Sequence, residues 1–471
     1  MKFDLGKNKL IFQCESELFK QVREHFSCPY EGHSFMKKKN KFIPSRKYFI
    51  TPTGQCDIGM FWEINKYLHE CNIVVPSSSI TDELRKFLTR QYDFKYYNNL
   101  TASGNALRDY QEDAVKTALK LGRGICLMGT GAGKTITTAS LIENYYLNSP
   151  NKNAFKCLVV VPDLGLVTQT YNDFLSYNVS FKPTRWTGNH DPDLTANVFV
   201  VNLAILQRRF EENEWLKHID LLVVDECHKG KAEVTGKVIS KILTPHKYGF
   251  TGTLPDTNGD KWSVLGKLGP VIFEKSSYDL RQENFLTNVE IKCVNLCYRP
   301  VPKMKYREEL DFIYDSDFRN NTIREIATKF PKNVLILINH IRHGEILLEK
   351  LQGISKKVYF IQGSVEVEER EKIKEIIEKH DDVVCIALSS IFSTGVNIKN
   401  LHMIMFAAGG KAFIRTVQSI GRGLRLHPSK NKLYIFDLID NLRYGIEHGI
   451  ARKDIYQREK IQFIEKNIRE P

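Results

Sequence analysis

The chain has 471 residues, enough for two or three domains that each bury their own core. Hydrophobic residues make up 42% of it and charged residues 26%, as in ordinary globular proteins, and no apolar run is long enough to cross a membrane. The 68 basic residues outnumber the 55 acidic ones, and the net charge of +13 favours a polyanionic partner, most often nucleic acid, although solvated lysines alone also produce such an excess.

The cysteines and the first residues indicate where the protein works. The ten cysteines are scattered without any C-x-x-C spacing, which predicts reduced thiols rather than disulfides or a zinc site. The first residues contain no sustained apolar stretch before a small-residue cleavage site, so we expect no signal peptide. Both observations favour the cytoplasm, with no membrane partner.

Residues 1–100 carry no nucleotide motif and predict a small basic α+β domain. Strand-like stretches such as Lys9–Gln13 alternate with helical patterns such as Ser16–Phe26. Between them, basic residues interleaved with aromatic ones suit phosphate contacts and base stacking. A solvated basic hairpin beside a small core explains the same pattern equally well. On the first interpretation, nucleic acid is bound by Lys37, Lys38, Lys39 and Lys41.

Two stretches of short apolar runs separated by helical patterns follow. Such runs predict parallel sheets with both faces covered. In the first stretch we expect strands at Ile125–Met128, Leu158–Val161, Val198–Val201, Leu221–Val224 and Tyr248–Phe250. In the second we expect strands at Val334–Ile338, Val358–Ile361, Val383–Ala387, Met403–Phe406 and Leu433–Phe436. The last residues, 443–471, have apolar positions at helical spacing and predict a helical extension.

A glycine-rich loop follows the first apolar run. The loop, which precedes an amphipathic helical pattern, consists of Gly129, Thr130, Gly131, Ala132, Gly133, Lys134 and Thr135. Strand, glycine-rich loop and helix are the context of a phosphate-binding loop, because glycines let backbone N–H groups converge on an anion at the helix N-terminus. We expect Lys134 to reach the β- and γ-phosphates of ATP and Thr135 to hold Mg²⁺. Met128 replaces the first glycine of the strict pattern, and a glycine-rich turn with an incidental lysine is the plainer alternative.

Two carboxylates end the strand expected at Leu221–Val224. Asp225 and Glu226 stand at the carboxyl end of a buried parallel strand, where ligands bind in open α/β sheets. Asp225 suits a magnesium partner acting through the metal's water shell, and Glu226 suits a base for the attacking water. A helix-capping aspartate is the alternative, but it does not explain a phosphate loop in the same stretch.

The tetrapeptide Asp225-Glu226-Cys227-His228 matches the DExH variant of the superfamily 2 helicases, and other motifs follow in that family's order. The resemblance implies that adenine is recognised by Arg108, Tyr110 and Gln111, the last through an amide that both donates and accepts. It further implies a first DNA-contact motif that includes Pro162 and Gln169. Thr251-Gly252-Thr253 resembles the motif that couples the ATP site to strand movement.

The second lobe resembles the same family in two further motifs. The stretch Ser393–Asn397 resembles the motif that contacts backbone phosphate and nucleotide, which implies roles for Thr394 and Gly395. Residues 418–425 match Q-x-x-G-R-x-x-R, which implies catalytic roles for Gln418, Arg422 and Arg425. A guanidinium from the second lobe stabilises the charge that develops on the transferring phosphoryl group, and residues three apart share one helix face. A solvated surface arginine pair is the alternative.

The ordered set of motifs spans about residues 105–440 and implies two tandem RecA-like lobes after a basic α+β domain, an α/β fold overall. The domains expected are nucleic-acid binding at 1–100, the ATP-binding lobe at 101–285, the second lobe at 286–442 and the helical extension at 443–471. Within the superfamily the chain resembles the UvsW-type branch-migration helicases of bacteriophages, notably in residues 392–401.

That resemblance implies an ATP- and Mg²⁺-dependent DNA helicase or translocase, in a phage-infected bacterial cytoplasm, that unwinds forks and moves four-way junctions in recombination, repair or replication. An RNA helicase is the nearest alternative, because the shared motifs grip backbone phosphates. The motor of a restriction system and an ATP-gated clamp that remodels nucleic acid without hydrolysis are further alternatives. A clamp would not need Glu226, because it binds ATP without hydrolysing it. We expect the protein to be a monomer.

Overall fold

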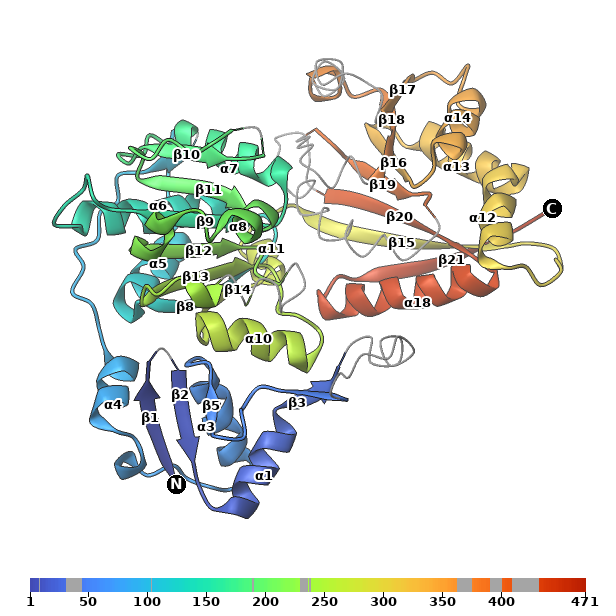
Figure 1. Ribbon diagram of the computed structural model, residues 1–471. Helices are drawn as coiled ribbons and strands as arrows, with labels where there is room; N and C mark the ends of the chain where they lie inside the picture. The colour runs from blue at the N-terminus through green and yellow to red at the C-terminus, as the bar shows by residue number, and fades with distance from the viewer. Residues whose placement is uncertain are drawn as a thin grey trace. The chain divides into compact units, whose positions relative to one another are not determined.

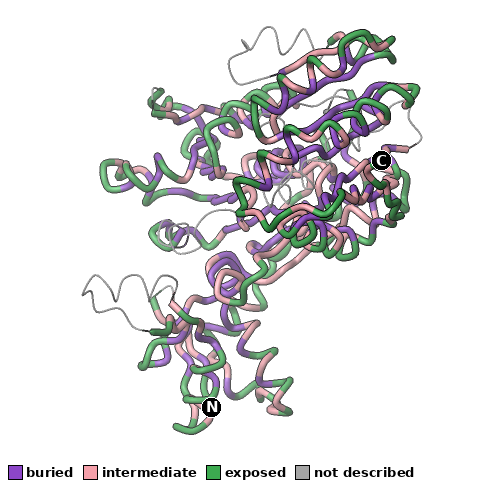
Figure 2. The backbone as a smooth tube through the Cα atoms, turned by 90° about the vertical axis from the view of Figure 1, so that its right-hand side faces the viewer, coloured by how far each residue is buried: buried purple, intermediate pink, exposed green. Residues whose placement is uncertain are grey.

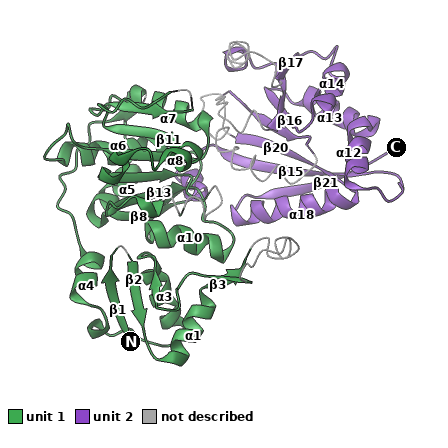
Figure 3. Ribbon diagram, viewed as in Figure 1, with its two compact units in different colours: residues 1–275 green, residues 276–471 purple. Residues whose placement is uncertain are grey.

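Figure 1 presents a computed structural model of the chain. The structure describes residues 1–7, 9–30, 45–102, 104–188, 190–228, 236, 239–361, 375–389, 400–408 and 432–471. The chain divides into two compact units, Met1–Lys275 and Ser276–Pro471, which Figure 3 draws in green and purple. Each unit contains one large parallel sheet.

The N-terminal part of the first unit, residues 1–90, is a small α+β fold with its own core. A three-stranded antiparallel sheet in the order β1-β2-β5 packs with helices around buried side chains such as Phe3, Phe12 and Ile64. Its elements are β1 (Lys2–Gly6), β2 (Lys9–Gln13), α1 (Ser16–His25), β3 (Ser27–Pro29), β4 (Arg46–Tyr48), β5 (Gln55–Cys56), α3 (Met60–Glu70) and α4 (Asp82–Thr89).

The rest of the first unit is a seven-stranded sheet in the order β10-β11-β9-β12-β13-β8-β14, with every neighbouring pair parallel. The five expected strands are present, and β10 and β14 extend the two edges. Its elements, after a short link of β6 (Thr101–Ala102) and β7 (Asn105–Ala106), are α5 (Asp109–Leu121), β8 (Arg123–Met128), α6 (Lys134–Asn148), β9 (Cys157–Val161), α7 (Leu164–Ser176), β10 (Pro183–Trp186), β11 (Val198–Asn202), α8 (Leu203–Arg209), β12 (Leu221–Asp225), β13 (His246–Thr251), α10 (Asn258–Leu268) and β14 (Val271–Lys275).

The second unit repeats this architecture with the strand order β17-β18-β16-β19-β20-β15-β21, again parallel throughout. The expected strands appear here too, and β15 and β21 are additions. Its elements are α11 (Ser277–Gln282), β15 (Asn288–Cys297), α12 (Tyr306–Asp315), α13 (Asp317–Lys329), β16 (Val334–Ile338), α14 (Ile341–Lys350), β17 (Lys357–Ile361), β18 (Val383–Leu388), β19 (Met403–Phe406), β20 (Lys432–Asp440), α18 (Arg443–Arg458) and β21 (Phe463–Arg469).

The last residues of the chain differ from the helical extension that their pattern predicts. Helix α18 ends at Arg458, and residues Phe463–Arg469 form strand β21, which pairs in parallel with β15. The pairing partner explains the difference, since β15 offers an unpaired edge that the sequence of residues 463–469 does not reveal.

Buried residues gather in continuous stretches of the chain, drawn in purple in Figure 2. Strands β9 and β16 consist of consecutive buried apolar residues, as expected for parallel sheets covered on both faces. The α/β fold of two tandem parallel-sheet lobes is therefore confirmed. All ten cysteines are free thiols. Within the described residues, no helix is both long and apolar enough to span a bilayer.

Candidate nucleotide-hydrolysis site

Three neighbouring strands of the first sheet carry the candidate motifs at one edge. Strands β12, β13 and β8 lie side by side and run parallel, so their carboxyl ends meet at the same edge of the sheet. β8 ends at the glycine-rich loop, β12 ends at Asp225, and β13 ends at Thr251. Motifs more than a hundred residues apart in the chain are therefore brought together by the strand order.

The loop 129–133 needs its glycines for conformation and space. Gly131 and Gly133 have φ of +85° and +79°, values that glycine adopts without strain. A Cβ on Gly133 would lie 2.3 Å from the Gln111 side-chain nitrogen. The loop is held at its start by a hydrogen bond from Gly129 N to Lys275 O at 2.9 Å, and α6 begins at Lys134. Backbone N–H groups and a helix N-terminus thus form the surroundings that bind phosphate.

Gln111 and Tyr110 support this loop from the start of α5. The Gln111 amide donates to Ala132 O at 2.8 Å and accepts from Arg108 N at 2.9 Å. The Tyr110 hydroxyl donates to the same Ala132 carbonyl at 3.0 Å and accepts from the Arg108 guanidinium at 3.0 Å. Burial raises the pKa of Tyr110, so the phenol keeps its proton. Residues expected to read adenine therefore also fix the shape of the phosphate loop, a role that the sequence did not indicate.

Lys134 and Glu226 face each other across the site. The Lys134 ammonium lies 3.6 Å from Glu226 Oε1 and donates to Met128 O at 3.4 Å. Glu226 N donates to Asp225 Oδ1 at 2.9 Å. Glu226 itself has a φ of +46°, which for a non-glycine residue costs on the order of 1 kcal/mol and is common at functional sites. The structure thus brings Lys134, Asp225 and Glu226 together.

His228 joins the DExH tetrapeptide to the end of β13. The buried Thr251 hydroxyl donates to Thr253 O at 2.8 Å, so the same oxygen accepts a short hydrogen bond from His228 Nδ1. That nitrogen also lies 3.3 Å from Glu226 Oε2. The histidine was not among the expected site residues. Its place in the tetrapeptide was the signal that pointed to it.

Mg²⁺ would depend on Asp225 and Thr135 together with the nucleotide. The described residues contain no group of three or more His, Cys, Asp or Glu side chains that could hold a metal by themselves. Thr135 is the second residue of α6, and Asp225 is the last residue of β12. One carboxylate, one hydroxyl and phosphate oxygens are the usual surroundings of Mg²⁺ in phosphate-loop enzymes, and these residues fit that need.

The expected nucleic-acid contacts are only partly within the described residues. Pro162 follows β9 directly and is half-buried, while Gln169 is exposed on α7. Asp163 between them caps α7 by accepting from Leu166 N at 3.0 Å. The remaining candidates lie outside the described residues, namely Lys37, Lys38, Lys39, Lys41, Thr394, Gly395, Gln418, Arg422 and Arg425.

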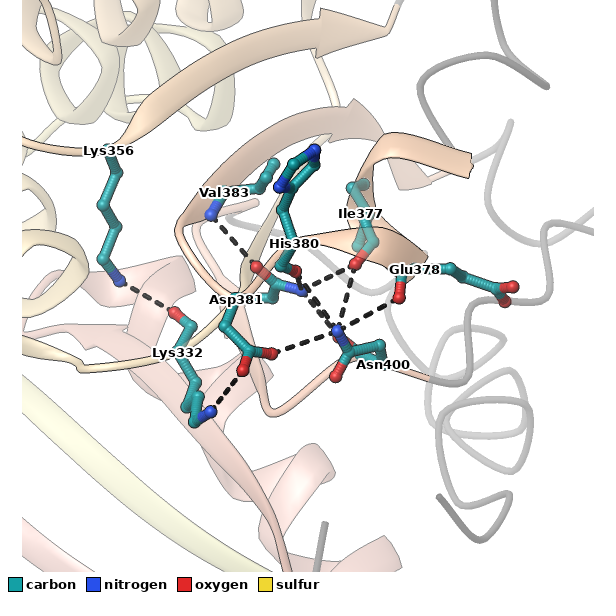
Figure 4. Close-up of polar contacts among 9 residues, drawn as sticks. Lys332, Lys356, Ile377, Glu378, His380, Asp381, Val383 and Asn400 are labelled. Atoms are coloured by element: carbon teal, nitrogen blue, oxygen red, sulfur yellow. Dashed lines mark hydrogen bonds and ion pairs between the residues drawn. The ribbon is translucent and has the colours of Figure 1, made fainter. Parts of the chain in front are cut away.

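In the second unit, a buried amide network includes Asn400, the first described residue after the sequence segment that carries Thr394 and Gly395. Asn333 accepts from Val383 N at 3.0 Å, and its Nδ2 donates to Ile377 O at 2.8 Å and Asn400 O at 2.9 Å. The Asn400 side-chain amide also donates to Ile377 O and to the Asp381 carboxylate, as Figure 4 shows. The network fixes the starts of β16 and β18 and the chain at Asn400, where it approaches β19.

Comparisons with known proteins agree with this architecture. Residues 105–256 match the family "Type III restriction enzyme, res subunit", and residues 319–427 match the helicase conserved C-terminal domain. The ATP-dependent DNA helicase uvsW of Enterobacteria phage T4 is 27% identical over 492 residues, which cover 97% of this chain and 96% of that protein. The DNA 3'-5' translocase XPB2 of Sulfurisphaera tokodaii is 24% identical over 359 residues, 68% of this chain and 78% of that protein. The Pyrococcus furiosus Hef helicase domain shares the fold, with a TM-score of 0.52 at 14% identity over 73% of this chain and 98% of that one.

Two parallel-sheet lobes, a phosphate loop beside a DExH tetrapeptide and these two domain matches define the class: the chain is a superfamily 2 helicase of the DExH type, an enzyme that uses ATP. Within that superfamily it resembles the UvsW-type helicases of bacteriophages over nearly its whole length.

Proposed function

We propose that the chain is an ATP-dependent DNA helicase or translocase that unwinds forks and moves four-way junctions in recombination, repair or replication. The observation that carries this proposal is the convergence of Lys134, Asp225 and Glu226 at one edge of the first sheet, in a chain that matches a phage DNA helicase over 97% of its length. We further propose that it acts as a monomer in the cytoplasm of an infected bacterium; the relative from Enterobacteria phage T4 supports the bacterial host.

In this proposal the nucleotide is ATP with Mg²⁺. The adenine would lie against Arg108, Tyr110 and Gln111, and the phosphates against Gly129, Thr130, Gly131, Ala132, Gly133, Lys134 and Thr135. Thr135 and Asp225 would hold the Mg²⁺ ion, which neutralises charge on the phosphates during hydrolysis. Gln111 keeps one N–H and one lone pair for adenine after its bonds to Ala132 and Arg108, since an amide has two donors and two acceptor sites.

Glu226 is the general base of the proposed reaction. Its carboxylate Oε1 lies 3.6 Å from the Lys134 ammonium, so the proposed base stands beside the proposed phosphate ligand. With Lys134 on the phosphate oxygens, the carboxylate would take a proton from the attacking water.

The hydrogen bonds of His228 provide a link from hydrolysis to movement. His228 Nδ1 contacts both the Glu226 carboxylate and the Thr251 hydroxyl, and Thr251 donates to Thr253 O. A change at Glu226 would reach the Thr-Gly-Thr segment through His228 and its hydrogen bond to Thr251. We propose this chain as the connection between the ATP site and strand movement.

The second lobe carries further proposed functional residues. We propose Gln418, Arg422 and Arg425 as catalytic residues on the pattern of their spacing, with Gly395 beside the nucleotide. Thr394, Pro162 and Gln169 would contact the DNA backbone. The proposed domain division follows the motifs, at 1–100, 101–285 and 286–442, while residues 443–471 continue the second lobe, whose sheet includes β21.

The basic N-terminal segment is the proposed additional DNA contact. Lys37, Lys38, Lys39 and Lys41 lie in the segment between β3 and β4. Basic and aromatic side chains also lie together at the flanking strand β4. The Arg23 guanidinium of α1 lies 3.8 Å from the Tyr48 ring centre, and the Lys47 ammonium lies 5.1 Å from the ring centre of Phe49, which follows β4. Neutralising Lys37, Lys38 and Lys39 should weaken DNA binding and flatten its salt dependence, because each lost phosphate contact lowers the salt slope by about one.

Strand displacement tests the proposed function. The full chain with ATP and Mg²⁺ is incubated with a labelled DNA fork, a four-way DNA junction and an RNA fork of matched sequence. We expect separation of both DNA substrates, complete loss in Lys134→Ala, and full activity in Lys120→Ala, an exposed lysine on α5. Separation of the RNA fork alone would make the chain an RNA helicase, and DNA unwinding by Lys134→Ala would refute the phosphate-loop assignment.

A further inference from the structure

The first unit contains a pocket at the edge of the sheet opposite the nucleotide site. It lies where β8, β13 and β14 begin, between the sheet and helices α3 and α4 of the N-terminal part. Most of its wall consists of aromatic and aliphatic side chains with one cation. The aromatic residues are Trp62, Phe87 and Tyr92, the aliphatic ones are Leu121, Pro270 and Ile272, and the cation is Arg123. Its volume is about 130 Å³.

The size of the pocket suits one large side chain. An apolar cavity of about 150 Å³ is known to bind benzene, so 130 Å³ accommodates the ring of one aromatic residue or a branched aliphatic group. Rings that line a pocket favour an aromatic guest, because edge-to-face contacts add roughly 0.5–1.5 kcal/mol to its burial. Leu121, one of the lining residues, is 41% exposed and is therefore accessible to a guest.

The pocket is built rather than incidental. Tyr92 covers the end of α5 at Gly122, whose φ is +77° and where a Cβ would lie 2.2 Å from the Tyr92 ring. Arg123 is held by hydrogen bonds to Lys267 O at 2.8 Å and Leu268 O at 3.3 Å, with its guanidinium 5.6 Å from the Phe87 ring centre. These contacts fix the rings and the cation in place.

The charge around the pocket is positive. None of the described residues that line it is acidic. Burial lowers the pKa of Arg123 to about 10, so its guanidinium stays charged at neutral pH, and Arg90 lies 4.7 Å from the Tyr92 ring centre. The nearby Asp57 carboxylate is already paired with Lys9 at 2.5 Å and Lys267 at 2.6 Å. An acidic group entering the pocket would therefore meet uncompensated positive charge.

The pocket takes no part in the hydrolysis described above. Arg123 is the first residue of β8 and Met128 the last, so at about 3.3 Å per residue the phosphate loop lies roughly 17 Å away. The candidate DNA-contact residue Pro162 also stands at the carboxyl edge of the sheet, beyond the end of β9. A guest at the opposite edge leaves both sites open.

We infer that this pocket docks a partner protein through an acidic peptide segment that inserts one aromatic side chain between Trp62, Phe87 and Tyr92 and places a carboxylate beside Arg123. A peptide fits better than nucleic acid, because one charged side chain among the described residues lines the pocket and the DNA-contact motif lies at the opposite edge of the sheet. The docked partner would be held on the first unit while the helicase works.

Fluorescence anisotropy tests the docking site on the full chain. The probe is a labelled eight-residue peptide with four aspartates before a C-terminal phenylalanine, and its controls carry serine for phenylalanine or lysine for aspartate. We expect binding of the probe and at least about tenfold weaker binding of both controls. Leu121→Glu should weaken the probe by about tenfold and Leu121→Lys should not, because only the glutamate adds negative charge at the rim.

A matched variant and a DNA probe separate the outcomes. Leu175→Glu changes an exposed leucine on α7, away from the pocket, and should leave peptide binding unchanged. DNA-stimulated ATP hydrolysis should be normal in all three variants, which shows that they fold. Absence of peptide binding, or equal loss in Leu121→Glu and Leu175→Glu, would overturn the proposal. Loss of single-stranded DNA binding in Leu121→Glu alone would do so too, by making the pocket a nucleic-acid site.

Discussion

Replacing Gln111 by alanine should weaken the binding of every nucleoside triphosphate, not of ATP alone. The amide holds the phosphate loop through Ala132 O at 2.8 Å and is itself held by Arg108 N at 2.9 Å. Each neutral hydrogen bond contributes about 0.5–1.5 kcal/mol, so the two together stabilise the loop by about 1–3 kcal/mol. Because 1.4 kcal/mol corresponds to tenfold, we expect Kd to rise about tenfold for ATP and for GTP alike.

The assay is titration with fluorescent ATP and GTP analogues in the presence of Mg²⁺. Gln111→Glu is the matched variant, since its carboxylate still accepts from Arg108 N but cannot donate to Ala132 O. It should weaken both nucleotides at least as much as alanine does, because two oxygens then face each other. An adenine contact adds a further loss for ATP only. Unchanged GTP affinity in both variants would refute the role of Gln111 in supporting the loop.

Three further predictions follow from single residues. Glu226→Gln should keep ATP affinity within about twofold while slowing single-turnover hydrolysis by 10²–10⁴-fold, and a loss of binding instead would show that Glu226 is not the base. Asn333→Leu should destabilise the second sheet by about 2–5 kcal/mol, because the buried Val383 N–H and Asn400 O lose their bonds to the amide. Amide hydrogen exchange in β16 and β18 should become faster, and unchanged protection would contradict the prediction. Burial lowers the pKa of Lys247 to about 7, so between pH 7 and about 10 the unfolded chain binds more protons than the folded chain. The free energy of unfolding of the first unit should therefore rise with pH in this range. Lys247→Met should remove this rise, and an unaltered slope would contradict the assignment.

The sheets could be predicted from sequence because their strands are short and wholly apolar. Val334–Ile338 and Met403–Phe406 were expected with the bounds that β16 and β19 have. β21 was missed because Phe463–Arg469 is exposed over most of its length and carries charged residues, a pattern that tertiary pairing with β15 overrides. The superfamily and the helicase function were predicted from the order of the motifs and are confirmed by the comparisons.

Contacts between motifs could not be predicted in the same way. The sequence identifies Gln111 and Ala132 as parts of separate motifs, but their hydrogen bond depends on how α5 packs beside α6. The bond between His228 and Thr251 likewise requires β12 and β13 to be neighbours in the sheet. Asn333 carries no motif at all, and only the fold shows that its amide joins the starts of two strands. The roles of the candidate site residues stay predictions for the experiments above.

The most direct test of the central claim is the rate of ATP hydrolysis with a panel of nucleic acids. The panel contains linear single-stranded DNA, linear duplex, a DNA fork, a four-way DNA junction and RNA of matched sequence. We expect strong stimulation by the fork and the junction, weaker stimulation by linear DNA and none by RNA, with all stimulation lost in Lys134→Ala. Stimulation by RNA alone would contradict it, leaving a helicase whose substrate is not DNA.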